Sequence, residues 1–271
     1  MGAFTDWPDP WVIIGGAIAL VTTRLHFVTT VYLPAMRDPY SAAKSIGTAA
    51  VLARGGRLEL GIGVGWCREE FELLGQQFER RGKRTDEMLE LMKALWSPGW
   101  TEFSGEFYTA PRMEMEPTPP PHIPVYVGGL SDIALRRAAR HDGWIGGDLI
   151  TTERALERVS ALRELRADKG STMDGFEVIT PPLTDAFTPP EHYAAAEAGG
   201  ITGIITMPWM FYSGADASLT DKIDGMRRFF CEDLGVGLEL RRRRRGPPRR
   251  SRRAGSPTVG WRGGNRVVSD A

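Results

Sequence analysis

Residues 58–60 alternate between apolar and charged side chains, the pattern of a β-strand with one buried face. Side-chain bulk then disappears at every second position, at Gly61, Gly63 and Gly65. Glycines two apart lie on one face of a strand, so a flat ligand or another backbone can approach that face closely. Charged residues then begin a helix at Arg68. This arrangement favours a cofactor site at the strand end, but it equally suits close packing inside a barrel.

The same order of strand and helix repeats along the chain. Strands are expected near six positions, Leu25, Leu58, Val125, Trp144, Phe176 and Ile204. Helices with suitably spaced apolar residues are expected at 9–23, 38–54, 81–96, 132–140, 152–169, 191–198 and 219–234. A hairpin is expected at 102–108, turning at Ser104 and Gly105. Alternating strands and helices predict an α/β fold with a parallel sheet and right-handed crossovers.

Length and composition fit one large domain. The 271 residues are close to the usual size of a (β/α)8 barrel, about 250 residues. Two cysteines, Cys67 and Cys231, give no disulfide framework, which suits a reducing compartment and predicts a cytoplasmic protein. No signal peptide is expected, and the apolar run at 11–21 is too short to cross a bilayer.

The formal net charge of +0 combines two parts of opposite sign. Residues 236–271 contain eleven arginines and two acidic residues, and subtracting these from the totals of 34 and 34 leaves 23 basic and 32 acidic residues. The acidic body argues against nucleic acid as a partner. The basic segment has few apolar residues, so disorder is expected there. The expected organisation is therefore a barrel domain at 1–235 and a basic tail at 236–271.

Several familiar motifs are excluded by spacing. Gly-x-Gly-x-Gly is not the dinucleotide fingerprint, and the downstream acids Glu87 and Glu90 fall in a helical pattern. No clustered metal ligands or Ser-His-Asp arrangement is visible, so no metal site is expected. The histidines are expected to have structural roles, because three of them precede strands and chemistry in a barrel lies at the other end. They are His26, His122, His141 and His192.

Taken together, seven segments resemble the luciferase-like monooxygenase superfamily, and within it the F420-dependent oxidoreductases. They are residues 61–71, 78–84, 95–96, 103–108, 124–129, 134–139 and 142–144. The resemblance covers about 9–234 and implies a TIM (β/α)8 barrel with a flavin or the deazaflavin F420 at the C-terminal ends of the strands. Members of this superfamily begin with two further strands, which this chain is expected to lack. The basic tail has no counterpart in them.

The resemblance also indicates where the cofactor binds. Thr30 and Val31 match a non-proline cis peptide behind the central ring of the deazaflavin; an ordinary trans strand end is the alternative. The turn at 128–131 matches the phosphate site, where backbone N–H groups at a helix N-terminus bind an anion; a plain tight turn with Ser131 as N-cap is the alternative. The candidate cofactor-binding residues are Thr30, Val31, Gly63, Gly65, Glu69, Val127, Gly128, Gly129, Leu130 and Ser131.

Trp66 is the candidate catalytic residue, because it follows the glycine face and can wall the ring or the substrate pocket; a packing role is the alternative. Glu69 matches a cofactor-contacting position in some relatives. Glu69 and Glu70 also suit the solvated first turn of a helix, where the helix dipole favours acids. Cys67 is expected to be a small packing residue.

The expected function is an oxidoreductase that transfers a hydride between C5 of coenzyme F420 and a small organic substrate, with the protein supplying orientation and a dry pocket. Two alternatives stay open. One is an FMN-dependent luciferase-like monooxygenase using O2, and the other is a degenerate barrel that binds cofactor without turnover. The expected partners are a small-molecule substrate and a second copy in a homodimer, with no nucleic acid and no membrane.

Overall fold

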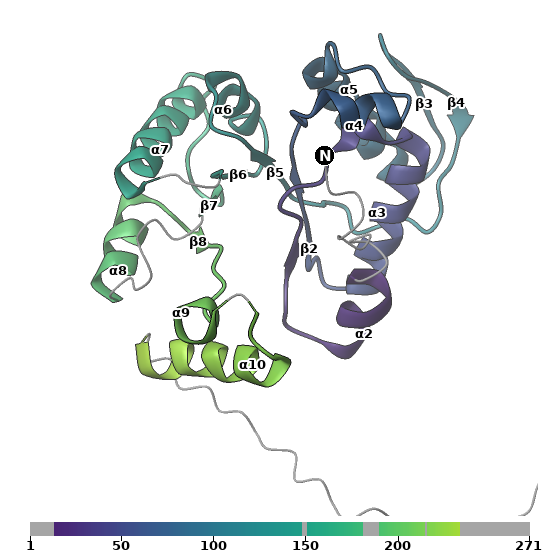
Figure 1. The fold of residues 1–271 in the computed structure, drawn as a ribbon. Helices are drawn as coiled ribbons and strands as arrows, with labels where there is room; N and C mark the ends of the chain where they lie inside the picture. The colour runs from purple at the N-terminus through teal and green to yellow at the C-terminus, as the bar shows by residue number, and fades with distance from the viewer. Residues whose placement is uncertain (1–13, 148–150, 181–189, 215, 234–271) are drawn as a thin grey trace, which may run out of the picture.

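The computed structural model describes residues 14–147, 151–180, 190–214 and 216–233 of the chain. Within these ranges six strands form a parallel sheet in the order β1-β2-β5-β6-β7-β8. They are β1 (Phe27–Val28), β2 (Leu58–Ile62), β5 (Val125–Gly128), β6 (Gly143–Ile145), β7 (Glu177–Thr180) and β8 (Gly203–Ile204). The sheet curls, with α3 (Pro39–Ala53) and α5 (Arg81–Trp96) outside one half and α6 (Asp132–Ala138), α7 (Thr152–Ala167) and α8 (Pro190–Gly199) outside the other (Figure 1). The predicted α/β fold with a parallel sheet is confirmed.

Helices precede the first strand of this sheet, connect its successive strands and follow the last one. They are η1 (Ile14–Ile18), α2 (Ala19–Val21), η2 (Pro34–Met36), α3 (Pro39–Ala53), α4 (Arg68–Leu73), α5 (Arg81–Trp96), α6 (Asp132–Ala138), α7 (Thr152–Ala167), α8 (Pro190–Gly199), α9 (Met210–Ser213), α10 (Leu219–Arg228) and η3 (Phe229–Asp233). The start of the helix expected at 9–23 and the basic tail lie outside the described residues. None of the helices in the described ranges is both long and apolar enough to span a bilayer.

Local sequence explains why α3 begins where it does. The side chain of Asp38 caps it by accepting a hydrogen bond from the backbone N–H of Ser41 at 2.8 Å, and Pro39 occupies the first turn. One face of the helix then packs against the sheet and α5. Its buried residues include Ala42, Ala43, Ile46, Ala49, Ala50 and Ala53. The small alanines allow α3 to approach its neighbours closely.

The expected hairpin forms, but its turn is longer than the sequence pattern indicates. β3 (Thr101–Ser104) and β4 (Thr109–Met113) pair antiparallel. The carboxylate of Glu87 on α5 explains the longer turn, because it accepts hydrogen bonds from three consecutive backbone N–H groups. The donors are Glu106, Phe107 and Tyr108, at 2.9, 2.7 and 2.7 Å. This contact fastens the hairpin to α5.

The main core lies between the sheet and its covering helices. Trp144, Leu60 and Leu89 are among its largest fully buried side chains. Burying a side chain of this kind stabilises the fold by about 1.5–3 kcal/mol. A smaller cluster of Ala35, Met36, Phe71 and the partly buried Leu33 and Phe78 packs separately. The main core fixes the sheet, and the smaller cluster supports the loops at its carboxyl edge.

The glycine face of β2 is covered by the chain that continues from β1. A Cβ atom at Gly61 would collide with the carbonyl oxygen of Thr29. The backbone N–H of Tyr32 donates to the Gly61 carbonyl at 2.8 Å, and the N–H of Gly63 donates to the Tyr32 carbonyl at 2.8 Å. At Gly61, therefore, the close packing expected as the alternative is what occurs, and another backbone takes the place of a ligand.

The histidines whose side chains are described have structural surroundings. His26 contacts the Glu59 carboxylate at 2.8 Å, and His122 contacts the Asp142 carboxylate at 3.0 Å. Burial lowers the pKa of His141 to about 4, with further lowering from Lys93 and Arg140. The side chain of His192 lies outside the described residues.

We expect His141 to make stability depend on pH. Its pKa of about 4 in the folded state lies below the ordinary 6.5, so the unfolded chain binds the proton first, and stability is lost as pH falls from about 6.5 to about 4. Between pH 7 and pH 4.5 the free energy of unfolding should fall less in the His141→Gln variant than in the parent, by up to about 2 kcal/mol. Urea unfolding at both pH values measures this, and identical pH dependence in the two proteins would contradict it.

Candidate active site

A cavity of about 440 Å³ opens at the carboxyl ends of the parallel strands. It is lined by Thr30, Val31, Leu33, Gly63, Val64, Gly65, Trp66, Glu70, Gly128, Gly129, Ile145, Gly146, Gly147 and Ile205. These residues end or follow β1, β2, β5, β6 and β8, so most of the strands of the curled sheet contribute to the cavity. Parallel α/β proteins bind ligands at this edge of the sheet.

Val31 forms the floor between two glycines. A Cβ atom at Gly63 would lie 2.8 Å from one methyl group of Val31, and one at Gly128 would lie 3.0 Å from the other. The Thr30–Val31 peptide bond is cis, as the resemblance implies. The glycines therefore let the Val31 side chain sit flat between the ends of β2 and β5.

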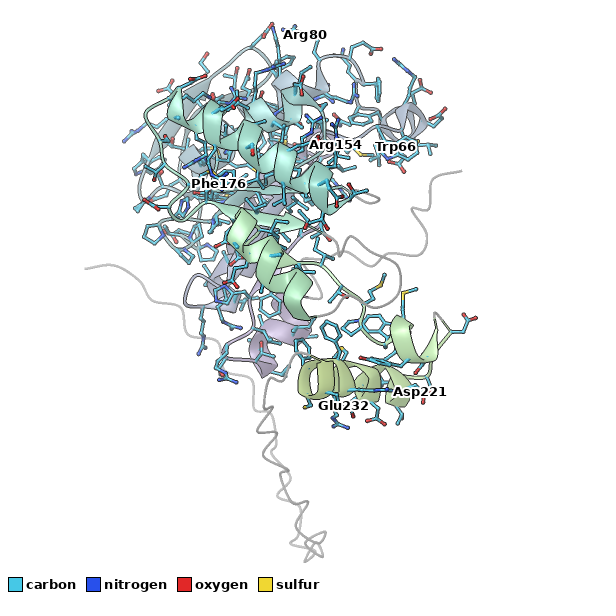
Figure 2. All side chains as sticks on the ribbon, turned by 90° about the vertical axis from the view of Figure 1, so that its left-hand side faces the viewer. Trp66, Arg80, Arg154, Phe176, Asp221 and Glu232 are labelled. Carbon is cyan, nitrogen blue, oxygen red and sulfur yellow. The ribbon has the colours of Figure 1, made fainter. Side chains whose placement is uncertain are left out.

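Trp66 stands at the rim of the cavity with 86% of its surface exposed. Figure 2 shows it at the outer edge of the molecule. A side chain this exposed adds little to packing, so the packing role considered for Trp66 is wrong. A large aromatic ring beside a cavity is instead available to a ligand.

Arg81 on α5 holds the segment that carries Trp66. Its Nε donates a hydrogen bond to the Gly65 carbonyl at 2.8 Å, and its guanidinium lies 3.8 Å from the ring centroid of Phe78. Phe71 lies beneath, where a Cβ atom at Gly65 would come within 2.8 Å of its ring. These contacts fix the backbone at the cavity rim, and the sequence motif around Arg81 gave no indication of them.

The turn after β5 is a tight turn with a capped helix. Gly129 has φ +122°, its N–H donates to the Ile145 carbonyl at 3.3 Å, and its carbonyl accepts from the Trp144 indole at 2.8 Å. The Ser131 hydroxyl caps α6 by accepting from the Ala134 N–H at 3.2 Å. The N-cap expected as the alternative is thus present, while Gly128 and Gly129 still line the cavity.

Four of the expected cofactor residues do not line the cavity. Val127 is buried in the sheet with 1% of its surface exposed. Leu130 and Ser131 are exposed beyond the turn. Glu69 is fully exposed, and hydrogen bonds from its own backbone N–H and from the Cys67 thiol lower its pKa. Their contact with a cofactor stays a prediction.

The structure places Glu70 rather than Glu69 at the cavity. Successive helical residues point about 100° apart. Burial of Phe71 in the smaller cluster fixes the rotation of α4, and this rotation decides which glutamate faces inward. Sequence reasoning also missed Leu33, Val64, Ile145, Gly146, Gly147 and Ile205. The Gly146-Gly147 pair after a strand repeats the signal found at residues 61–65 and could have been recognised.

The cavity lining has few polar or charged side chains. Among the described residues it contains no histidine, lysine or arginine, and Glu70 is its one ionisable side chain. No group of three or more potential metal-ligating residues occurs in the described part of the chain. Such a site can bind a ligand and orient it against apolar side chains and glycine backbone.

Comparison with known proteins agrees with this architecture. The family model for luciferase-like monooxygenases matches residues 1–220. The chain belongs to the luciferase-like monooxygenase family. Its members are oxidoreductases, and the predicted kinship is confirmed.

Relatives of this luciferase-like chain differ in cofactor. An uncharacterized protein of Mycobacterium tuberculosis is 43% identical over 175 residues, which cover 61% of this chain and 60% of the relative. The FMNH2-dependent dimethylsulfone monooxygenase of Pseudomonas putida is 27% identical over 59% of this chain and 45% of its own length. A similar fold occurs in the coenzyme F420-dependent tetrahydromethanopterin reductase of Methanopyrus kandleri, with a TM-score of 0.55 and 18% sequence identity. The match covers 64% of this chain and 54% of the reductase. The chain thus spans about 60% of the length of its first curated relatives.

We expect Trp66→Ala to weaken ligand binding without weakening the fold. Loss of a stacking surface should lower affinity for a flavin or deazaflavin roughly tenfold. Unfolding free energy should stay within about 0.5 kcal/mol, because Trp66 is exposed. Fluorescence titration and chemical unfolding measure the two effects.

Trp100→Ala is the matched control for this variant. Trp100 is also exposed, at 63%, and it lies outside the cavity, against Arg112. Equal affinities of the two variants would remove Trp66 from the site.

Proposed function

We propose that the chain is an oxidoreductase that transfers a hydride between coenzyme F420 and a small organic substrate. The observation that carries the proposal is the cavity at the carboxyl edge of the sheet, with its flat floor at Val31 and its glycine-lined walls. Membership of the luciferase-like family supports redox chemistry. The choice of F420 rests on the resemblance of residues 61–71 and 124–129 to F420-dependent members.

The residues present fit such a cofactor. A planar ring system can lie against Val31, because the glycines on either side of it project no side chain. Gly129 would face the phosphate at the cavity wall. Its own N–H donates to the Ile145 carbonyl, so other backbone N–H groups of this wall would hold the anion. Lysine and arginine are missing from the described lining, so the phosphate contacts would come from backbone N–H groups.

The bound cofactor would supply the hydride chemistry at C5. The chain itself would do three things: hold the ring against Val31, keep water away with Leu33, Ile145 and Ile205, and close the rim with Trp66. Glu70 is the residue placed to accept or donate a hydrogen bond to a substrate at this rim.

An FMN-dependent monooxygenase is the second candidate function, favoured by the FMNH2-dependent relative from Pseudomonas putida. Absorbance separates the two, since F420 and FMN absorb at different wavelengths. A chain that binds either cofactor but turns over no substrate would instead be a binding protein. We also propose that the enzyme works in the cytoplasm and as a homodimer.

A cofactor titration of two Gly129 variants tests the phosphate contact. Both Gly129→Ala and Gly129→Asp place a side chain at φ +122°, which costs about 1–3 kcal/mol in each. Only the aspartate adds a negative charge beside the phosphate. We expect F420 to bind Gly129→Asp at least tenfold more weakly than Gly129→Ala, measured by absorbance, with FMN titrated in parallel. Equal affinities in two folded variants would overturn the assignment.

We expect the chain to be dimeric in solution. Within the described residues β1 and β8 are the two edges of the parallel sheet, and unpaired edges present free backbone donors and acceptors that favour association. Light scattering after size exclusion should give twice the mass of one chain. A monodisperse monomer with one cooperative thermal transition would rule the dimer out.

A further inference from the structure

The cavity has two walls of different chemistry. The wall after β5 and β6 consists of backbone, from Gly128, Gly129, Gly146 and Gly147, together with Ile145. The wall after β1 and β2 carries most of the side chains. They are Thr30, Val31, Leu33, Val64, Trp66 and Glu70. A substrate lying against this second wall meets mainly apolar surface and one carboxylate.

The carboxylate of Glu70 has no charged partner among the described residues. The nearest arginines along the chain are engaged elsewhere. Arg68 pairs with Glu79 at 2.7 Å. Arg80 pairs with Glu106, and Arg81 donates to the Gly65 carbonyl at 2.8 Å. A carboxylate at an apolar surface gains most from a ligand that donates a hydrogen bond or carries positive charge. Glu70 is therefore free to select the ligand.

We propose that the cavity takes a substrate with an apolar body and one hydrogen-bond donor, an amine or an alcohol, and rejects carboxylates and sulfonates. The donor group would meet Glu70, and the apolar body would lie against Leu33, Val64 and Trp66. The proposal rests on the proposed function, because the rest of the cavity is then filled by the cofactor. A second negative charge near Glu70 meets repulsion that solvent only partly screens, which lowers affinity about tenfold at a partly exposed site.

Three ligands with the same carbon skeleton test this selectivity: phenethylamine, phenethyl alcohol and phenylacetate. Calorimetry measures their dissociation constants with the full chain, both with F420 and without it. The amine should bind about tenfold more tightly than phenylacetate, with the alcohol between them. Equal affinities for the amine and the acid in the unaltered chain would overturn the proposal.

Two variants of equal charge change assign the effect to one residue. Glu70→Gln removes the carboxylate at the cavity, and the ratio between amine and phenylacetate should fall to about one. Glu72→Gln removes a carboxylate on the exposed side of the same helix, α4, and should keep the tenfold ratio. A ratio that persists in Glu70→Gln would also overturn the proposal.

Titration of F420 into the same proteins separates this inference from the proposed function. If the chain binds F420 but shows no preference for the amine over phenylacetate, the proposed substrate class is wrong and the proposed function stands. If the chain prefers the amine but does not bind F420, the selectivity of the cavity stands and the proposed function is wrong.

Discussion

The close approach of the β1 chain to the glycine face of β2 is the constraint on which the site depends. The backbone of Thr29 lies so close to Gly61 that no side chain fits at this position. The Thr29 hydroxyl also donates a hydrogen bond to the Gly61 carbonyl at 2.7 Å. This contact brings the following residues across the end of β2, so that Val31 reaches the cavity floor and Leu33 its wall. A side chain at Gly61 would displace the β1 chain and the floor with it.

Two separate hydrophobic clusters stabilise the sheet and the cavity rim. The main core fixes the sheet through large buried side chains such as Trp144. The small cluster around Phe71 supports the cavity rim, where Phe71 and Phe78 meet edge to face at 5.4 Å and Arg81 binds the rim backbone. The rim therefore rests on a cluster of its own rather than on the main core.

The charges are arranged outside the cavity. Glu87 holds the hairpin, Arg137 pairs with Asp86 at 2.6 Å, and Arg81 binds a backbone carbonyl. The cavity is left with backbone, apolar side chains and the single carboxylate of Glu70 within the described residues. Such a lining suits a planar redox cofactor, which carries the reactive atom itself and needs the protein mainly for orientation.

The sequence by itself determined the features that depend on neighbouring residues. Helix caps such as Asp38, the six strand positions and the glycine-rich strand end all follow from local pattern, and resemblance to a family placed Thr30, Val31 and Gly129 at the cavity. Only the tertiary structure decided that Gly61 faces a backbone and that Glu70, not Glu69, faces the cavity. The reason is physical: both outcomes depend on strand pairing and helix rotation between segments far apart in the chain, which local periodicity does not encode.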